Sequence, residues 1–317
     1  MHIVTGGAGF IGSNVVRGLN GLGITDIVVV DDFEQGEKHL NLNSLRVADF
    51  VDVRGAAAFR AKLSGAQVES VSHQGACSDT TEKNGRYMME TNYESSKAWF
   101  EFAAGRCPFV YASSAATYGD GVAGFREEPA CEWPLNMYGF SKLAFDNWVR
   151  ERLSSVKTPV VGLRYFNVYG PQENHKGRMA SVIFKLFQQA SRGEDLTIFE
   201  GSDKFLRDFI WVGDVVDVNL HFLEHSARGI FNCGSGRAES FESLARATAS
   251  HFSGVRVKTV PFPDDLRGKY QAFTRADLTA LRAAGYSREF TSLAEGVQRY
   301  VELLKSSGGH FRAPIQR

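Results

Sequence analysis

The sequence has 317 residues, of which 43% are hydrophobic and 23% charged, and its 36 Lys and Arg residues balance 36 Asp and Glu residues. This length favours two packed domains, and the composition excludes a disordered, collagen-like or coiled-coil protein. Because the formal net charge is zero, no overall field attracts nucleic acid or an anionic membrane surface. We therefore expect small-molecule partners, with no nucleic acid and no membrane.

The cysteines and the apolar runs bear on the compartment. Cys77, Cys107, Cys131 and Cys233 include no Cys-x-x-Cys pair, so neither a zinc ribbon nor a disulfide scaffold is predicted. The first residues do not form a basic segment followed by an apolar run, and no stretch of 18 uncharged apolar residues occurs. We expect a cytoplasmic protein that is neither secreted nor membrane-spanning.

The first half of the chain alternates short β-branched runs with longer periodic segments, which is typical of βαβ units and a parallel sheet. A helix is expected over 141–153. The nearly continuous apolar character of the runs suits strands that are covered on both faces. The expected strands are 2–4, 26–31, 68–73, 108–113 and 159–166. The fold class predicted is α/β, with a Rossmann-like doubly wound parallel sheet.

The pattern changes after Gly170. A helix is predicted around 180–189, and strands over 208–212 and 229–233 are both expected to return to the first sheet. Near the end, Ser292 to Glu295 is a capping box that opens an amphipathic helix.

Two domains follow from this pattern. We expect a dinucleotide-binding domain over 1–170, to which 208–235 returns. A smaller mixed α/β substrate-binding domain is expected over 171–207 and 236–317.

A glycine-rich motif, Gly6-Gly7-Ala8-Gly9-Phe10-Ile11-Gly12, lies between the first strand and the helix that follows. Gly6, Gly9 and Gly12 would let the backbone approach a pyrophosphate at the helix N-terminus. A strand ends at Asp31, near the spacing expected for an acid that binds the adenosine ribose. The alternative is a glycine turn that only packs a helix on a strand.

A second constellation joins Ser114, in the run Ser113-Ser114-Ala115-Ala116-Thr117 at a strand end, with Tyr138 and Lys142 at the start of a helix. Tyr138 and Lys142 are four residues apart and share a helix face. A nearby ammonium group would lower the pKa of the phenol, so that Tyr138 could exchange a proton with a substrate hydroxyl. A Tyr-x-x-x-Lys pair alone occurs by chance, but the glycine motif upstream makes this combination specific.

These residues, with Thr5 preceding the glycine motif, resemble the extended short-chain dehydrogenase/reductase family. A closer resemblance, to ADP-L-glycero-D-manno-heptose 6-epimerases, runs from Met1 to about Leu304 and covers both expected domains. The segments that carry it are Met88-Met89, Tyr111 to Gly119, Arg164 to Pro171, His175-Lys176-Gly177, Phe199 to Ser202 and Tyr270 to Thr274.

The resemblance implies a nucleotide-sugar epimerase whose tightly held nicotinamide cofactor oxidises C6 of ADP-heptose to a ketone and returns the hydride to the other face. A carbinol carbon with no adjacent carbonyl is not acidic enough for simple deprotonation, and transient oxidation avoids that step. The family places two acid/base groups at positions matching Tyr138 and Lys176, while Ser114 would hydrogen-bond the reacting oxygen. Without the resemblance, Lys176 would be interpreted as a solvated surface lysine.

The resemblance and the glycine motif together assign two sets of binding residues. Cofactor-binding residues are Gly6, Gly9, Phe10, Ile11, Gly12, Asp31, Asp32, Lys38, Gln74, Gly75, Ala76, Cys77, Ser78, Asn92, Tyr138, Lys142, Val168 and Lys176. Substrate-binding residues are Ser114, Asn167, Arg178, Lys185, Phe199, Glu200, Gly201, Ser202, Arg207 and Tyr270. The family also implies a homo-oligomer, a pentamer, and a place in lipopolysaccharide core biosynthesis.

Several positions depart from the family pattern. Val53 replaces a lysine near the adenosine phosphate, with Arg54 adjacent, and Thr91 stands beside Asn92 where an asparagine is common. Arg178 and Lys185 replace a serine and a histidine near the substrate. A more basic pocket could hold the same diphosphate by other groups, since arginine suits phosphate.

The choice between NAD and NADP rests on opposing charges. Asp31 and Asp32 would repel a 2′-phosphate, whereas Lys38 and Arg54 could neutralise it. The family favours NADP and tolerates NAD, so we expect NADP, with NAD as the alternative.

Three alternative functions compete with this prediction. A UDP- or dTDP-sugar 4-epimerase or 4,6-dehydratase shares the fold, but a dehydratase would carry an Asp-Glu pair after Thr117, where this chain has Tyr118-Gly119. A cofactor-binding sensor or scaffold would usually lack the active-site tyrosine or lysine, and both are present. A metal site at His221-x-x-Glu-His225 has no evident third ligand, so no metal is expected.

Overall fold

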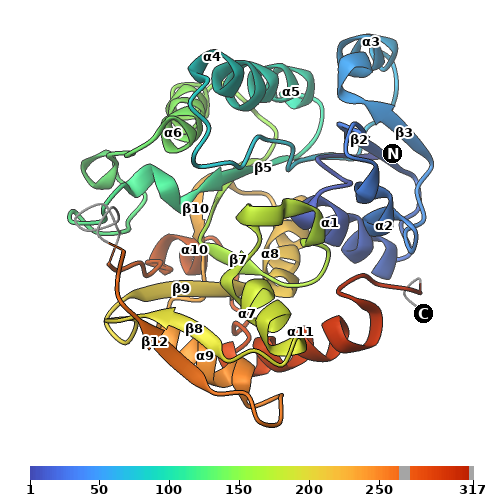
Figure 1. The fold of residues 1–317 in the computed structure, drawn as a ribbon. Helices are drawn as coiled ribbons and strands as arrows, with labels where there is room; N and C mark the ends of the chain where they lie inside the picture. Colours follow the sequence, from blue (N-terminus) through green and yellow to red (C-terminus); the bar gives the residue numbers. More distant parts are fainter. Residues whose placement is uncertain (264–271, 314–317) are drawn as a thin grey trace.

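The computed structural model describes residues 1–263 and 272–313, and its centre is a seven-stranded, wholly parallel sheet (Figure 1). Its strands are β1 (His2–Thr5), β2 (Ile27–Asp31), β3 (Asp49–Asp52), β4 (Ser70–His73), β5 (Phe109–Ser114), β6 (Val160–Tyr165) and β10 (Arg228–Cys233). They are arranged in the order β10-β6-β5-β4-β1-β2-β3. The predicted doubly wound sheet is confirmed.

Helices cover both faces of this sheet (Figure 1). They are α1 (Phe10–Gly21) and α8 (Val212–Glu224) on one face, and α3 (Ala56–Lys62), α5 (Ser95–Ala103) and α6 (Met137–Arg150) on the other. Neighbouring residues of β2 point to opposite faces, so Val29 packs with Val16 of α1 while Val28 and Val30 pack with Trp99 of α5. This two-sided burial explains why the strands read as continuous apolar runs.

The strand order reverses between β1 and β4, because the chain builds β2 and β3 on one side of β1 and then β4, β5 and β6 on the other. In such sheets, ligands bind in the crevice at the carboxyl ends of the strands beside this switch point. Gly6 follows β1 with φ of +64°, and a Cβ there would lie 2.6 Å from the backbone nitrogen of Gly75, which follows β4. Glycine is therefore required where these two loops meet.

A second layer of smaller sheets lies at one side of the parallel sheet (Figure 1). A three-stranded sheet contains β7 (Asn167–Tyr169), β9 (Leu206–Trp211) and β11 (Ala238–Ser240), and β8 (Leu196–Phe199) pairs with β12 (Val257–Val260). The helices α7 (Val182–Ser191), α9 (Phe241–Ala249) and α11 (Leu293–Ser307) pack against them around a separate apolar core.

The prediction that 208–212 returns to the main sheet is wrong. β9 pairs with β7 and β11, and only β10 joins the main sheet, at its edge beside β6. The apolar run Phe209 to Val212 resembles a central strand, but apolar character does not say which sheet a strand joins. After β9 the chain continues as α8, which packs against α1 on one face of the main sheet.

The helix that carries Tyr138 begins at Met137 rather than at 141, because the Asn136 side chain accepts a hydrogen bond of 2.8 Å from Gly139 N and caps it. Serine side chains cap three later helices: Ser181 precedes α7, Ser240 precedes α9, and the predicted Ser292 precedes α11. The shorter helices are α2 (His39–Leu42), α4 (Gly85–Met88) and α10 (Thr279–Ala283). Within the described ranges, no helix is long and apolar enough to cross a membrane.

Candidate active site

A cavity of about 1700 Å³ lies at the carboxyl edge of the parallel sheet. It is lined from the loops after β1, β4 and β5, from the start of α6, from the β6 to β7 crossing and from the 3₁₀ segment Asn174–Met179. Pockets for one drug-sized ligand are typically about 300–1,000 Å³, so this cavity is larger than one such ligand needs.

The glycine motif forms the N-terminus of α1 inside this cavity. Gly9 is the N-cap residue, no side chain caps the helix, and its first turn holds no acidic residue. A Cβ at Gly9 would meet one atom within 4 Å, the Gly6 carbonyl oxygen at 3.2 Å, so the backbone is open there. Free N–H groups and the positive end of the helix dipole suit a pyrophosphate, and the loop fits a nicotinamide dinucleotide.

Asp31 and Lys38 lie together at the end of β2. Asp31 Oδ2 accepts a hydrogen bond of 2.8 Å from Ala8 N, so this buried carboxylate also holds the glycine loop in place. Lys38 Nζ lies 2.9 Å from Asp31 Oδ1 and is only partly exposed. Asp32 and Val53 also line this end of the cavity. An acid and a base stand side by side where the adenosine ribose is expected, so their charges alone do not choose between NAD and NADP.

The loop Gln74–Ser78 lines the cavity on the other side of the glycine motif. Asn92 does not line it. Its amide is fully buried, accepts from Cys77 N at 2.8 Å, and donates to Cys77 O and to Ser141 Oγ, both at 3.0 Å. Asn92 therefore fixes the loop from behind and joins it to α6, and its neighbour Thr91 lines the cavity instead.

Ser114 ends β5, Tyr138 stands in the first turn of α6, and Lys142 lies one turn further; all three line the cavity. A hydrogen bond with Ser114 lowers the Tyr138 pKa, but burial has the larger effect and raises it overall. Lys142 Nζ donates to Ala112 O at 2.9 Å, and burial lowers its pKa to about 8. Burial thus outweighs the hydrogen bond with Ser114, and the structure does not show the lowering of the Tyr138 pKa that was expected beside an ammonium group and a nicotinamide ring.

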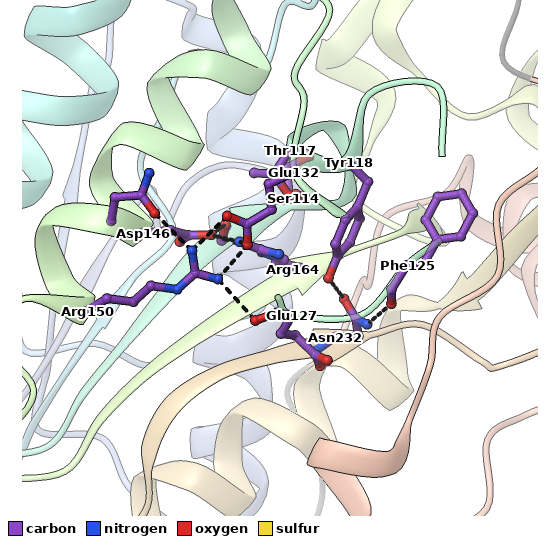
Figure 2. A network of polar contacts seen from close by, with 12 residues as sticks. Ser114, Thr117, Tyr118, Phe125, Glu127, Glu132, Asp146, Arg150, Arg164 and Asn232 are labelled. Carbon is purple, nitrogen blue, oxygen red and sulfur yellow. Dashed lines mark hydrogen bonds and ion pairs between the residues drawn. The ribbon is translucent and has the colours of Figure 1, made fainter. Parts of the chain in front are cut away.

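A buried ionic network holds α6 against β5 and β6 (Figure 2). Asp146 of α6 accepts hydrogen bonds from Tyr111 at 2.9 Å and Ser113 at 2.8 Å on β5, and from Arg164 at 2.9 Å on β6. Glu132 binds Arg164 at 2.6 Å from the other side. Because Asp146 follows Lys142 by one helical turn, this network sets the register that brings Tyr138 to Ser114. Sequence reasoning missed it, although the spacing Tyr138, Lys142, Asp146 could have indicated it.

Lys176 lines the same cavity from the 3₁₀ segment Asn174–Met179, with its Nζ 5.2 Å from the centre of the Phe10 ring. Burial lowers the pKa of Lys176, and Lys185 lowers it further, while Glu173 opposes both. The structure thus brings Lys176 to the glycine motif and away from the fully solvated position that its local sequence suggested.

The expected substrate-binding residues divide into three groups. Asn167, Arg207 and Ser114 line the cavity. Six others are absent from its lining: Arg178, Lys185, Phe199, Glu200, Gly201 and Ser202. Arg178 forms an ion pair with Asp79, with 2.5 Å between Arg178 Nη2 and Asp79 Oδ2, and Asp79 does line the cavity. Tyr270 lies outside the described residues.

His73 is a lining residue that sequence reasoning missed. It stands at the carboxyl end of β4, between Thr5 Oγ1 at 2.6 Å and Ser96 Oγ at 2.9 Å. Burial lowers its pKa to about 3, so the ring is neutral at physiological pH. A histidine ending a predicted strand beside the glycine motif was the available signal.

The histidine pair at the end of α8 does not form a larger cluster. The His221 and His225 rings stack with their centres 4.2 Å apart. In residues 1–263 and 272–313, no group of three His, Cys, Asp or Glu residues is arranged to hold a metal ion.

The fold and the cavity place the protein in the class of doubly wound α/β proteins that bind dinucleotides at the switch point of the sheet. The chain belongs to the NAD-dependent epimerase/dehydratase family, which matches residues 2–234.

Solved structures of similar fold span nearly the whole chain. ADP-L-glycero-D-manno-heptose-6-epimerase of Helicobacter pylori is 27% identical, with a TM-score of 0.82 over 96% of both chains. UDP-glucose 4-epimerase of Thermotoga maritima is 28% identical, with a TM-score of 0.81 over 97% of this chain and 99% of that one. The Thermus thermophilus UDP-glucose 4-epimerase, solved with NAD, is 28% identical, with a TM-score of 0.80 over 97% of this chain and 100% of that one.

Proposed function

We propose that the protein interconverts ADP-D-glycero-D-manno-heptose and ADP-L-glycero-D-manno-heptose by epimerisation at C6. The observation that carries this proposal is the presence of two candidate proton carriers, Tyr138 and Lys176, in one cavity beside the glycine motif. The sequence segments that resemble heptose 6-epimerases and the likeness to the Helicobacter pylori enzyme support the choice of substrate.

The nicotinamide cofactor supplies reversible hydride transfer at the reacting sugar carbon. Gly6, Gly9 and Gly12 would hold its pyrophosphate, and Asp31 with Lys38 would meet the adenosine ribose. Lys142 would bind near the nicotinamide. We propose NADP, with NAD as the alternative, because the heptose 6-epimerases that the sequence resembles favour NADP and Lys38 stands beside the acid that would otherwise repel a 2′-phosphate. Mass spectrometry of the cofactor that dissociates on denaturation tests this choice.

The two proton carriers have opposite tendencies. This suits a reaction in which one group takes the proton of the C6 hydroxyl as the ketone forms, and the other gives a proton to the same oxygen as the ketone is reduced. Burial keeps the Tyr138 phenol protonated, so it is ready to act as an acid. Burial also favours the neutral amine of Lys176, so it is ready to act as a base. After one turnover Lys176 carries the proton and Tyr138 has lost it, which is the state that the reverse reaction needs. Ser114 would hydrogen-bond the reacting oxygen throughout.

A UDP-sugar 4-epimerase is the second candidate, because two such enzymes are as similar in sequence and fold as the heptose enzyme. A 4,6-dehydratase is disfavoured, since Tyr118 and Gly119 stand where an Asp-Glu pair would be expected. A sensor or scaffold is disfavoured by the presence of Tyr138 and Lys142 in the cavity.

The same resemblance supports a pentameric homo-oligomer that supplies heptose for lipopolysaccharide core assembly in the cytoplasm. Analytical ultracentrifugation measures the assembly. We also propose that the chain forms two domains, one from 1–170 and 208–235 and the other from 171–207 and 236–317.

The decisive assay supplies ADP-D-glycero-D-manno-heptose and, separately, UDP-glucose, and follows C6 or C4 by NMR. We expect conversion of the heptose alone. Conversion of UDP-glucose alone would replace this proposal with the 4-epimerase.

Lys176→Met should slow heptose conversion by roughly 10² to 10⁴, the range for a positioned acid/base group, while the folded variant still binds substrate and cofactor. Wild-type turnover in Lys176→Met would leave Tyr138 as the only base.

A further inference from the structure

Ser141 is a fully buried serine of α6, three residues after Tyr138, that the proposed mechanism does not use. Its hydroxyl donates a hydrogen bond of 2.7 Å to the backbone carbonyl of Tyr138. The same oxygen accepts a hydrogen bond of 3.0 Å from Asn92 Nδ2. Ser141 therefore connects the turn that carries Tyr138 to a side chain from a distant part of the chain.

Asn92 holds the loop after β4 with the rest of its amide. Asn92 Oδ1 accepts a hydrogen bond of 2.8 Å from Cys77 N, and Asn92 Nδ2 donates one of 3.0 Å to Cys77 O. One side chain thus binds both backbone polar groups of Cys77, within the loop Gln74–Ser78 that lines the cavity beside the glycine motif. The amide nitrogen has two hydrogens, so one can serve Cys77 O and the other Ser141 Oγ.

The backbone around Asn92 is anchored to the main sheet. Asn92 lies in a π-helical segment, Met89–Glu94, and such wide turns often occur at functional sites. Ser96 Oγ donates to Asn92 O at 2.6 Å and lies 2.9 Å from His73 Nε2, at the end of β4. Because the Ser96 hydroxyl hydrogen is already donated, His73 Nε2 is the donor in this second contact. The position of Asn92 is therefore set by β4 as well as by its own helix.

We propose that Ser141 is a positioning residue for Tyr138, which keeps this proton carrier in register with the loop on the cofactor side of the cavity. The inference rests on the proposed role of Tyr138 and deepens it. Hydride transfer at C6 and proton transfer at its oxygen need the cofactor and the phenol to be aligned on one sugar carbon. A misplacement of about 1 Å can cost roughly 10²-fold in rate. The link through Asn92 joins the loop that borders the cofactor to the turn that carries the phenol.

The other contacts of α6 have a different direction. Lys142 Nζ donates to Ala112 O at 2.9 Å, and Asp146 accepts from Ser113 at 2.8 Å and from Arg164 at 2.9 Å. These contacts hold the later turns of α6 against β5 and β6. The Ser141 contacts act on the first turn itself and connect it to the loop after β4.

The test is Ser141→Ala, which removes the hydroxyl and leaves both hydrogen bonds between Asn92 and Cys77 in place. We expect kcat, counted per bound cofactor, to fall roughly tenfold, since the freed turn can shift by a fraction of an ångström. The dissociation constant of the cofactor should stay close to the wild-type value. Steady-state epimerisation assays give kcat and KM, and fluorescence titration of cofactor-free protein gives the dissociation constant. Wild-type kcat per bound cofactor in Ser141→Ala would overturn the proposal.

Asn92→Leu breaks the link from its other end. Because it also releases Cys77, it should raise the dissociation constant of the cofactor severalfold as well as lower kcat. The double variant with Ser141→Ala should have the kcat of Asn92→Leu, since the link is already broken. Fully additive losses of kcat would overturn the proposal. Asn92→Asp, which keeps the acceptor for Cys77 N and loses both donors, takes the place of the leucine variant if that variant does not fold.

Thr248→Val is the matched control. Thr248 is also fully buried in a helix, and its hydroxyl donates to Leu244 O at 3.0 Å within the second apolar core. We expect a loss of thermal stability similar to that of Ser141→Ala, with kcat per bound cofactor unchanged. An equal fall of kcat in both variants would show that general destabilisation lowers activity, against the proposal.

Failure of the proposed function gives a different pattern. Wild-type turnover in Tyr138→Phe would remove Tyr138 as a proton carrier, and the positioning role with it, whereas the weaker cofactor binding of Asn92→Leu would remain. Slow turnover in Tyr138→Phe together with wild-type turnover in Ser141→Ala would leave the proposed function standing and overturn the positioning role alone.

Discussion

Burial shifts the pKa values of the cavity's side chains more than neighbouring charges do. It raises the pKa of Tyr138, lowers the pKa of Lys142 to about 8, and lowers those of Lys176 and His73. The spacing of Tyr138 and Lys142 predicts that they share a helix face, and they do. The spacing does not predict that Lys142 donates a hydrogen bond to Ala112 O, because the burial of the Lys142 side chain depends on strands that are distant in sequence.

Tyr138→Phe tests the first proton carrier. The variant loses the hydroxyl and almost no volume, so heptose epimerisation should fall by roughly 10² to 10⁴ while cofactor remains bound. Stopped assays with NMR detection measure the rate, and absorbance of the purified protein reports the cofactor. Because phenylalanine cannot exchange a proton at any pH, turnover close to wild type would remove Tyr138 from the mechanism.

His73 should make the protein sensitive to acid. Its folded pKa of about 3 lies below the ordinary histidine value of 6.5, so the unfolded state binds the proton more tightly. This stability is fully present above pH 6.5 and is lost as the pH falls towards 3, by up to about 5 kcal/mol for a shift of this size.

The comparison uses denaturant unfolding of the wild-type protein and His73→Asn at pH 7.5 and pH 5. Asparagine cannot take up the proton, so the free energy of unfolding should fall less between these two pH values in the variant. An identical fall in both proteins would show that another group causes the acid sensitivity.

Helices, strands and loops that depend on a continuous local sequence pattern are predicted best. The strands β1, β2, β4, β5 and β6 follow from their apolar runs, and the loop with Gly6 from its glycines. The placement of β9 was missed, because pairing with β7 and β11 is set by partners elsewhere in the chain. The run Phe199 to Ser202 was expected at the substrate and is absent from the cavity lining.

The Asp79–Arg178 ion pair joins the loop after β4 to the segment that carries Lys176. Lys185 Nζ adds a hydrogen bond of 2.8 Å to Arg178 O. Arg178 is 70% exposed and Asp79 27% exposed, so each single substitution should change stability by less than about 1 kcal/mol.

Breaking this ion pair should lower activity more than stability, because the Asp79–Arg178 pair lies at the edge of the cavity. Asp79→Asn and Arg178→Gln should each lower kcat/KM severalfold, and the double variant should be no worse than either single one. Steady-state kinetics with all three variants form a double-mutant cycle. Fully additive losses would show that the two residues act separately.

At the scale of the whole molecule, the segment 308–313 returns from α11 to the nucleotide-binding side (Figure 1). Gly309 O accepts a hydrogen bond of 2.9 Å from Gln172 N, and the Arg17 guanidinium lies 3.8 Å from the centre of the Phe311 ring. His310 Nδ1 lies 3.1 Å from both Asn41 Oδ1 and Gln172 Oε1. The C-terminal segment thus contacts α1, α2 and the loop that follows β7.

Asn41 connects this segment to the cofactor loop, and His310→Ala tests the connection. The Asn41 amide is fully buried and donates to Ala8 O of the glycine motif at 2.9 Å, while its own oxygen accepts from His310. His310→Ala leaves that buried oxygen without its donor, which costs about 1–3 kcal/mol, and Asn41 should then hold the glycine loop less firmly.

We expect His310→Ala to raise the dissociation constant of the cofactor severalfold, measured by fluorescence titration of cofactor-free protein. Phe311→Ala is the control, because it removes the ring under Arg17 from the same segment and leaves Asn41 untouched. Both variants should lose some thermal stability, since a cation–π contact is worth about 0.5–1 kcal/mol at an exposed site. Only His310→Ala should weaken cofactor binding, because only His310 contacts the side chain that holds Ala8. Equal weakening in the two variants would mean that the segment acts through packing alone, and unchanged binding in both would separate the C-terminal segment from the cofactor site.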